Sequence, residues 1–259
     1  MTIFTSAVVF RNPSGHVLTA RKQGTSRFML VGGKPEPGEN PLEAALREVE
    51  EETGIRLEPG ELSLLGLWQT AAANEAGHQV HGTAYVSRRI LTTTPTPATE
   101  LAELRWLDPD NPFDAQFAPL LTTRILPALA GRPLPWDPGN VPEAEFAPEI
   151  STSLINLIVA GVKTTTSSRV RDYGGTRLPR RGDLAVVRDP KGTSLGVIET
   201  TGVAVTAARD LSLEHIRGEG EGFSTYEDWK DAHIAAWGGV EDCEEIVAET
   251  LRFHRQPSA

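Results

Sequence analysis

What most constrains the fold is one continuous stretch, GGKPEPGENPLEAALREVEEETG, in which a glycine-punctuated loop leads directly into a helix. Asn40 is a favoured N-cap, Pro41 suits the first helical position, and Glu43 stands where a capping box requires an acid. Gly54 is typical of the residue that ends a helix. The stretch therefore predicts a helix over residues 41–53, preceded by an ordered loop.

The predicted helix has two chemically different faces. Its apolar residues recur at i, i+3, i+4 and i+7 and form one stripe: Leu42, Ala45, Leu46 and Val49. Three carboxylates share another face at i, i+3 and i+4: Glu48, Glu51 and Glu52. Glu50 falls elsewhere on the cylinder. The helix is thus expected to pack through one side and to concentrate negative charge on another.

Helical stability alone does not explain this carboxylate face. Like charges at this spacing repel one another by about 0.2–0.5 kcal/mol per pair. The glutamates also lie in the C-terminal half of the helix, where the helix dipole disfavours negative charge. The helix by itself leaves two interpretations open. One is a solvated acidic face, and the other is a site for a hard cation such as Mg²⁺, which binds carboxylate oxygens and keeps phosphates and water as further ligands.

The loop and the helix together match a longer pattern, G-x5-E-x7-R-E-V-x-E-E-x-G-I, which begins at Gly33 and ends at Ile55. This pattern resembles the Nudix box of the Nudix hydrolase family at every defined position, and the loop is similar to that of MutT-like members. The resemblance implies an α/β/α sandwich with a mixed sheet. It also implies hydrolysis of a nucleoside diphosphate linked to another moiety, with Mg²⁺ or Mn²⁺ as cofactor and a nucleotide as substrate.

The resemblance also implies a role for each matching residue. The residues that would hold the metal are Glu48, Glu51 and Glu52 with the backbone carbonyl of Gly32, and Glu100 lies where many relatives place an additional acid. Arg47 would belong to the catalytic residues together with Glu48 and Glu52. It would pair with Glu39 and hold the loop against the helix. The general base stays open between Glu48, Glu52 and Glu100, and the alternative for Glu100 is a solvated residue before a strand. Metal ions would neutralise the diphosphate and activate the attacking water.

Strand-like runs surround the helix in the first half of the chain: Thr5–Phe10, His16–Ala20, Leu64–Gln69 and Gly82–Arg88. A second helix is expected near residues 115–129. His78 and His81 are interpreted as loop or strand-edge residues, with a substrate contact as the alternative. Residues 131–147 are rich in Pro and Gly and are interpreted as a linker, so the Nudix domain is expected over residues 1–130.

The second half, residues 148–259, reads as a separate α+β domain. An amphipathic run over residues 148–161 ends at a glycine, and the strand-like runs LAVVRD, SLGVIETT and VAVTAAR follow. Two further helices are expected near residues 225–237 and 241–252. Short strands with peripheral helices predict a barrel-like domain and, with the first half, a two-domain α+β protein.

The run GVKTTT places Lys163 and Thr166 at the G-x-K-x-x-T spacing, which is similar to the signature of ASCH domains with their PUA-like β-barrel fold. The pieces LPRRGDLAVV, GVIETTGV and GEGFSTYEDWKDAH also resemble the bacterial ASCH subgroup. This resemblance implies RNA or a nucleotide as ligand. Some relatives are amidohydrolases acting on acetylated cytidine, and the matching catalytic residues would be Lys163, Thr166 and Glu199. The alternative is binding alone, with Lys163 holding a phosphate.

Trp229 and His233 stand at i and i+4 of the helix expected near residues 225–237. They either line the ligand cleft of the ASCH-like domain or pack in its core.

The charge distribution bears on the partners. The net charge of −10 disfavours non-specific binding of nucleic acid by the whole chain, yet residues 163–191 carry eight basic side chains against three acidic ones. An RNA- or nucleotide-binding regulator is therefore the alternative to a Nudix enzyme, and both halves processing modified nucleotides is a third possibility. A single cysteine, Cys243, and the absence of a signal-like or membrane-spanning run predict a cytoplasmic protein.

Overall fold

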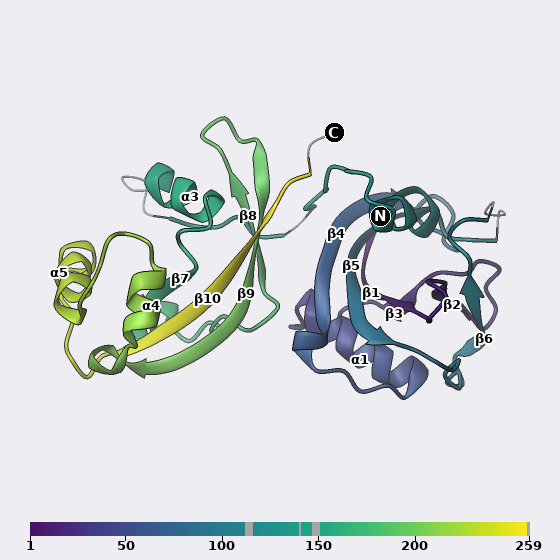
Figure 1. The fold of residues 1–259 in the computed structure, drawn as a ribbon, viewed down its shortest axis with the longest axis horizontal. Coiled ribbons are helices and arrows are strands. Elements are labelled where there is room, and N and C mark those ends of the chain that lie inside the picture. Colours follow the sequence, from purple (N-terminus) through teal and green to yellow (C-terminus); the bar gives the residue numbers. More distant parts are fainter. Residues whose placement is uncertain (112–115, 140, 147–150, 258–259) are drawn as a thin grey trace. The chain divides into compact units, whose positions relative to one another are not determined.

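The computed structural model describes residues 1–111, 116–139, 141–146 and 151–257, which form two compact units (Figure 1). The division between the units falls at residues 140–141. This point lies inside the segment 131–147 that was expected to be a linker, of which residues 140 and 147 are outside the described part.

The first unit contains a six-stranded mixed sheet with the strand order β4-β5-β1-β2-β6, and β3 pairs with β1. β1 and β5 run parallel, and the other described pairs are antiparallel. Three of the four expected strands lie within β1, β4 and β5, and the fourth, His16–Ala20, begins one residue before β2. The strands are β1 (Thr2–Arg11), β2 (Val17–Lys22), β3 (Val31–Gly33), β4 (Leu62–Ala71), β5 (Gln79–Ile90) and β6 (Leu101–Leu107).

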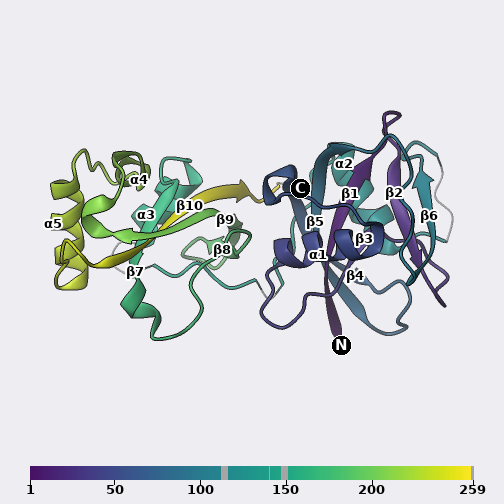
Figure 2. The same ribbon diagram turned by 90° about the horizontal axis from the view of Figure 1, so that it is seen from below.

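Helices cover this sheet on both faces (Figures 1 and 2). On one face lies α1 (Pro41–Thr53), whose Ala44, Ala45 and Val49 are fully buried. On the other face lies a helical segment made of a π-helical turn, Leu121–Ile125, and α2 (Leu126–Leu129). A short 3-10 turn, Pro59–Glu61, leads into β4. The arrangement is the expected α/β/α sandwich.

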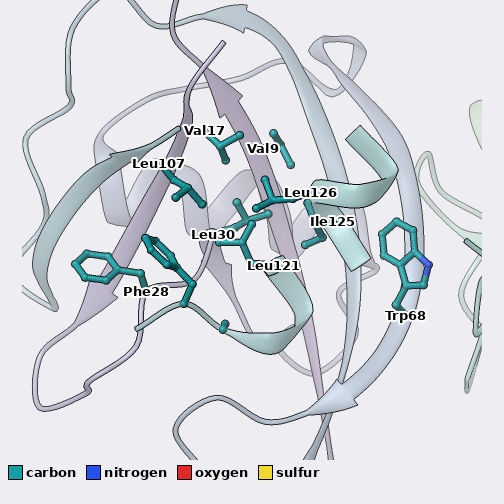
Figure 3. Packing of buried hydrophobic residues seen from close by; sticks show 12 residues of the cluster. Val9, Val17, Phe28, Leu30, Trp68, Leu107, Leu121, Ile125 and Leu126 are labelled. Atoms are coloured by element: carbon teal, nitrogen blue, oxygen red, sulfur yellow. The ribbon is translucent and has the colours of Figure 1, made fainter. Parts of the chain in front are cut away.

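The helix expected near residues 115–129 is shorter than predicted, since its helical residues begin at 119 and residues 112–115 are outside the described part. Its Leu121, Ile125 and Leu126 pack against Val9 of β1 and Trp68 of β4 in the main hydrophobic core (Figure 3). This packing fixes the sheet face opposite α1.

The second unit contains a four-stranded antiparallel sheet, in the order β7-β10-β9-β8, that curls into half a barrel. Its helices α4 and α5 lie at the end of the sheet where β9 stops and β10 starts (Figures 1 and 2). The elements are α3 (Ser151–Val159), β7 (Thr165–Arg169), a 3-10 turn (Val170–Tyr173), β8 (Leu184–Arg188), β9 (Ser194–Ala207), a 3-10 turn (Ala208–Asp210), α4 (Leu213–Gly218), α5 (Tyr226–Trp237) and β10 (Glu245–Arg255).

The helix expected near residues 225–237 is confirmed as α5, but the helix expected near residues 241–252 is wrong. That segment forms β10, the strand between β7 and β9. Its Glu and Ala content favours a helix locally, yet two neighbouring strands satisfy its backbone groups, and Ile246 and Val247 become fully buried. Tertiary pairing therefore overrides local propensity here.

The run expected over residues 148–161 contains α3, and its residues 148–150 are outside the described part. Throughout the described ranges, the helices are too short or too polar to cross a bilayer.

Candidate functional sites

The ends of α1 follow from its sequence as expected. The Asn40 side chain accepts from the Glu43 backbone N–H at 2.9 Å, and the Glu43 carboxylate accepts from the Asn40 N–H at 2.9 Å, which completes the capping box. Gly54 adopts a left-handed conformation with φ 71° and closes the helix. These caps fix where the carboxylate face of the helix begins and ends.

Arg47 holds the preceding loop against α1. Its Nε and Nη2 donate to the two oxygens of Glu39 at 2.8 and 3.0 Å, a bidentate pair that confirms the expected contact. Nη2 also donates to the Lys34 carbonyl at 3.0 Å. Arg47 Nη1 then donates to Glu48 at 3.0 Å and to Glu51 at 2.9 Å. One guanidinium therefore organises the loop and two of the three glutamates.

Glu48 lies directly over the loop at Gly33. A Cβ atom at residue 33 would come within 2.2 Å of the Glu48 Cδ and Oε1 atoms, so a larger residue there would displace this carboxylate from its position. The neighbouring Gly32 has φ 148°, and a Cβ there would lie 2.2 Å from the Ser6 carbonyl oxygen. The two glycines allow β3 to approach both β1 and the glutamate face of α1.

Glu52 is the most deeply buried of the three glutamates, with a side chain only 1% exposed. Its Oε2 accepts from the Gly32 N–H at 2.9 Å, and its Oε1 lies 3.0 Å from the Lys22 ammonium. Burial raises the pKa of the Glu52 carboxyl above its ordinary value, although Lys22 and the Gly32 N–H both oppose the rise. Glu52 is therefore a stronger base than a solvated glutamate.

The remaining acidic residues differ in surroundings. Glu51 is half exposed and bonds only to Arg47 among the described contacts, whereas Glu50 pairs at the surface with Arg56 at 2.6 Å. Glu100 is exposed, and its carbonyl accepts from the Gln23 N–H at 2.8 Å, next to Lys22 at the end of β2. Glu100 therefore lies close enough to Lys22 to raise its pKa, although Glu52 has the larger effect.

These oxygen donors fit a divalent cation in kind. Glu48, Glu51 and Glu52 come from one helix, Glu100 lies nearby, and Mg²⁺ prefers carboxylate and carbonyl oxygens. Within the described ranges, no three acidic, histidine or cysteine side chains are gathered as a metal cluster. In this arrangement the carboxylates are instead held by protein cations: Lys22 holds Glu52, and Arg47 holds Glu48 and Glu51.

A pocket of about 380 Å³ opens beside these residues. One end is lined by Glu48, Lys22 and Lys34, and the rest is mostly apolar, with walls that include Met29 and Leu120. The pocket therefore combines a charged end next to the carboxylates with an apolar end suited to an organic group.

The two histidines considered for substrate contact lie outside the lining of this pocket. His81 is buried, and its Nε2 hydrogen-bonds with the Asp137 carbonyl at 2.5 Å. His78 is exposed and hydrogen-bonds with the Ala76 carbonyl through Nδ1. His81 thus fixes the segment after α2.

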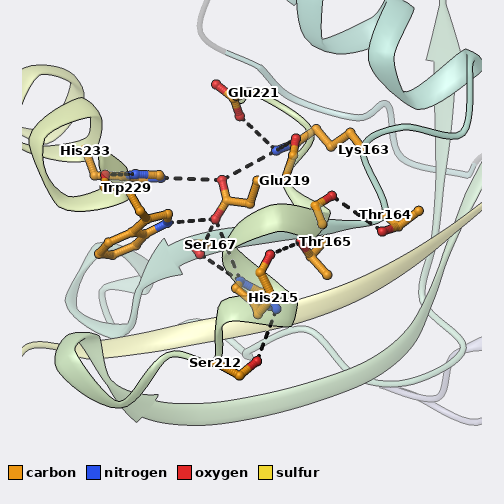
Figure 4. Close-up of polar contacts among 11 residues, drawn as sticks. Lys163, Thr164, Thr165, Ser167, Ser212, His215, Glu219, Glu221, Trp229 and His233 are labelled. Carbon is orange, nitrogen blue, oxygen red and sulfur yellow. Dashed lines mark hydrogen bonds and ion pairs between the residues drawn. The ribbon is translucent and has the colours of Figure 1, made fainter. Parts of the chain in front are cut away.

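The second unit contains a buried polar cluster around Glu219, a residue that the sequence did not single out (Figure 4). Glu219 is 2% exposed, and its Oε1 accepts from Ser167 Oγ at 2.6 Å and from Trp229 Nε1 at 2.8 Å. Its Oε2 lies 3.6 Å from Lys163 Nζ and 3.7 Å from His233 Nε2. Two titratable side chains from different segments therefore converge on one carboxylate oxygen.

Two further residues complete this cluster. Lys163 Nζ donates to Glu221 at 3.0 Å, so one ammonium faces two carboxylates. His215 Nε2 lies 3.0 Å from Ser167 Oγ, and burial lowers the pKa of this histidine below its ordinary value. Burial therefore favours the neutral form of His215.

Trp229 and His233 take different positions in this cluster. Trp229 is fully buried in the hydrophobic core of the second unit. His233 stacks on it at 4.3 Å between ring centroids. Trp229 therefore packs in the core of the unit, whereas the ring of His233 lies next to the Glu219 carboxylate.

Among the described contacts, the two residues expected to act with Lys163 have other partners. Glu199 of β9 contacts His254 at 2.7 Å, not the Lys163 cluster. Thr166 pairs with Glu249 in the register of β7 with β10. The structure instead brings Lys163 next to Glu219 and Glu221, which are more than fifty residues away in the chain and which only the run GEGEGF signals.

The basic stretch of residues 163–191 is largely paired. At least five of its eight basic side chains form ion pairs, and the described pairs are Lys163–Glu221, Arg169–Asp172, Arg171–Glu244, Arg177–Asp183 and Arg188–Glu143. Most of the positive charge in this stretch is therefore neutralised by neighbouring carboxylates.

Comparison with known proteins agrees with both units. The sequence-family model of the NUDIX domain matches residues 1–126, and the sequence-family model of the ASCH domain matches residues 144–252. The chain is 48% identical over 59 residues to m7GpppN-mRNA hydrolase NUDT17 of Xenopus laevis, covering 21% of this chain and 20% of the relative. It is 28% identical over 102 residues to the putative 8-oxo-dGTP diphosphatase of Bacillus subtilis (strain 168), covering 39% of this chain and 64% of the relative.

The chain thus spans less than two thirds of the length of either curated relative. Among solved structures, the crystal structure of the ASCH domain from Lactobacillus crispatus JV V101 is similar at 23% identity and a TM-score of 0.37, covering 43% of this chain and 78% of that chain. The two domain matches show that the chain consists of a NUDIX domain over residues 1–126 followed by an ASCH domain over residues 144–252.

Proposed function

We propose that the NUDIX domain hydrolyses the pyrophosphate linkage of a nucleoside diphosphate derivative, either a nucleoside triphosphate or a nucleoside diphosphate joined to another group. The observation that carries this proposal is the placement of Glu48 and Glu52 on one helix face against the Gly32–Gly33 loop, beside the pocket of about 380 Å³. Lys22 and Lys34 at the charged end of the pocket suit the phosphates, and the apolar end suits a base.

Each side chain of the site has a role in this proposal. Glu48, Glu51 and Glu52, with the Gly32 carbonyl, would hold Mg²⁺ or Mn²⁺, and Glu100 would add a ligand from the neighbouring loop. Such a cation neutralises phosphate charge and lowers the pKa of water. The general base is one of three carboxylates near the proposed cation, and the candidates are Glu52, Glu48 and Glu100. Arg47 is a positioning residue that fixes the loop and two ligands.

The curated relatives support the class of substrate. One is named as a hydrolase of capped mRNA and the other as a diphosphatase of 8-oxo-dGTP, so both names describe phosphoanhydrides of nucleotides. The two substrates share a modified guanine next to the phosphates, but they differ in the modification, in the sugar and in the group at the far end of the phosphate chain. The pocket walls outside the glutamate helix would therefore select the base or sugar in this chain.

A substrate screen tests the proposal. The purified chain would be incubated with nucleoside triphosphates, oxidised triphosphates, ADP-ribose and dinucleoside polyphosphates, with Mg²⁺ or with EDTA. We expect release of phosphate, pyrophosphate or a nucleoside monophosphate from at least one class with Mg²⁺ and none with EDTA. Hydrolysis that is equal in EDTA would contradict a metal-dependent site.

A second candidate function belongs to the ASCH domain, which we propose binds a nucleotide or RNA. The convergence of Lys163, His233 and Glu219 favours a ligand site, because buried titratable groups of this kind are frequent at functional sites. Phosphate recognition by Lys163 is disfavoured because its ammonium faces both Glu219 and Glu221. An amidohydrolase acting on acetylated cytidine through this cluster is the catalytic alternative.

RNA binding is expected to be weak and only shallowly salt-dependent. If Arg180 and Arg181 are the main phosphate contacts, the slope of log K against log salt for single-stranded RNA should be near −1.4, at about 0.7 per contact. Fluorescence anisotropy measures this slope when the RNA is titrated at salt concentrations from about 20 to about 200 mM. Charge reversal of both arginines to Glu should abolish the dependence. Absence of RNA affinity at low salt would leave the nucleotide as ligand.

A further inference from the structure

Both oxygens of Glu52 already have a partner within the protein, Oε2 through a hydrogen bond and Oε1 through an ion pair. The Gly32 N–H donates to Oε2 at 2.9 Å, and the Lys22 ammonium lies 3.0 Å from Oε1. The Glu52 side chain is 1% exposed, so its negative charge depends on these partners for compensation. A divalent cation that binds Glu52 therefore competes with Lys22 for the same oxygen.

The Lys22 side chain has space to adopt a second position. It is the last residue of β2, its side chain is 31% exposed, and it lines the pocket that also contains Glu48. A lysine side chain has four flexible carbons and three donors on a compact ammonium, which allows it to turn from one partner to another. The Lys22 side chain can therefore turn away from the buried Glu52 carboxylate and toward the open pocket.

We propose that Lys22 is the internal counter-cation of Glu52 in the metal-free protein, and that it moves into the pocket when a divalent cation takes its place. In the displaced position the ammonium faces the space where an anionic group of the substrate would lie. Metal binding thereby adds positive charge to the pocket in two ways, through the cation and through the freed lysine. This inference rests on the proposed metal-dependent function and assigns Lys22 the role of a positioning residue.

The inference makes a specific prediction for Lys22→Met. Removing the competitor should lower the Kd for Mn²⁺, measured by electron paramagnetic resonance without substrate, by at least roughly tenfold. In EDTA the same variant should melt at a lower temperature than the wild-type chain, because Glu52 loses its counter-charge. Addition of Mn²⁺ should remove this difference in melting temperature, because the cation replaces the missing positive charge. Neither measurement involves turnover.

Lys34→Met is the matched control. Lys34 lines the same end of the pocket, and within the described residues its ammonium forms no ion pair with the glutamates. Its removal changes the local charge by the same amount through screened, longer-range interactions, so the Kd should fall by no more than about threefold. Lys22→Gln, which keeps a hydrogen-bond donor near Glu52, serves if the Met variant does not fold, and the Kd should fall with it as well.

The outcomes separate the two claims. Equal Mn²⁺ affinity in the Lys22 and Lys34 variants, or weaker binding in the Lys22 variants than in the wild-type chain, would overturn the role of Lys22 and leave the proposed hydrolase intact. If the wild-type chain binds no Mn²⁺ at all, the proposed function fails and the inference falls with it. A selective gain in affinity in the Lys22 variants supports the exchange.

Discussion

Glu52→Gln is expected to reduce turnover of the substrate found in the screen by more than about a hundredfold, equivalent to about 2.7 kcal/mol of transition-state stabilisation. The substitution keeps the shape of a side chain that is 1% exposed and bonded to Gly32, but it removes the negative charge and the basic oxygen. Both proposed roles, metal ligand and base, are lost together. Initial rates with saturating Mg²⁺ measure the effect.

Glu50→Gln is the matched control for this prediction. Glu50 lies on the same helix, two residues away, and pairs only with Arg56 at the surface, an interaction worth about 0–1 kcal/mol. Its activity should equal that of the wild-type chain. Near-wild-type turnover in Glu52→Gln, or an equal loss in Glu50→Gln, would contradict the assignment.

Trp229→Ala is expected to destabilise the ASCH domain by about 3–5 kcal/mol, the usual cost of removing a large aromatic side chain from a core. Trp229 is fully buried in the cluster with Ile216 and Ile246, and it also donates to Glu219 at 2.8 Å. The variant loses both the packing and one of the hydrogen bonds that satisfy the buried carboxylate. Differential scanning calorimetry would show the change in the transition of this domain.

Trp229→Phe provides a graded control. It keeps a ring in the core and removes only the hydrogen bond to Glu219 and part of the volume, so its loss of stability should be smaller than that of Trp229→Ala. Hydrolysis by the NUDIX domain should be unchanged in both variants, because the two domains form separate compact units. A uniform loss of activity and of both transitions would show that the domains do not behave independently.

The sequence predicted best where the determining contacts are local. Helix α1 was located from a capping box and a terminal glycine, and the pair of Arg47 with Glu39 spans only eight residues. Strand β10 was missed because its own residues favour a helix, and the pairing with β7 and β9 that decides its conformation is distant in sequence.

The same reasoning explains which side chains of the two sites were missed. Lys22 lies thirty residues before Glu52, on a strand where a terminal lysine has no distinctive pattern. Glu219 reaches Lys163 across 56 residues, and no local spacing in the sequence links the two positions. Contacts of this kind follow from the fold and not from local spacing, so they became visible only with the structure.

The central position of β10 has a consequence for synthesis on the ribosome. Strand β7 pairs only with β10 within its sheet, yet β10 begins more than seventy residues later in the chain. The strands and helices of the NUDIX domain are all complete before residue 140, so that domain can fold while the ASCH domain is still being made. During that interval β7 and one edge of β9 are without their partner, and nascent chains that stall before Glu245 expose two strand edges to aggregation or chaperone capture.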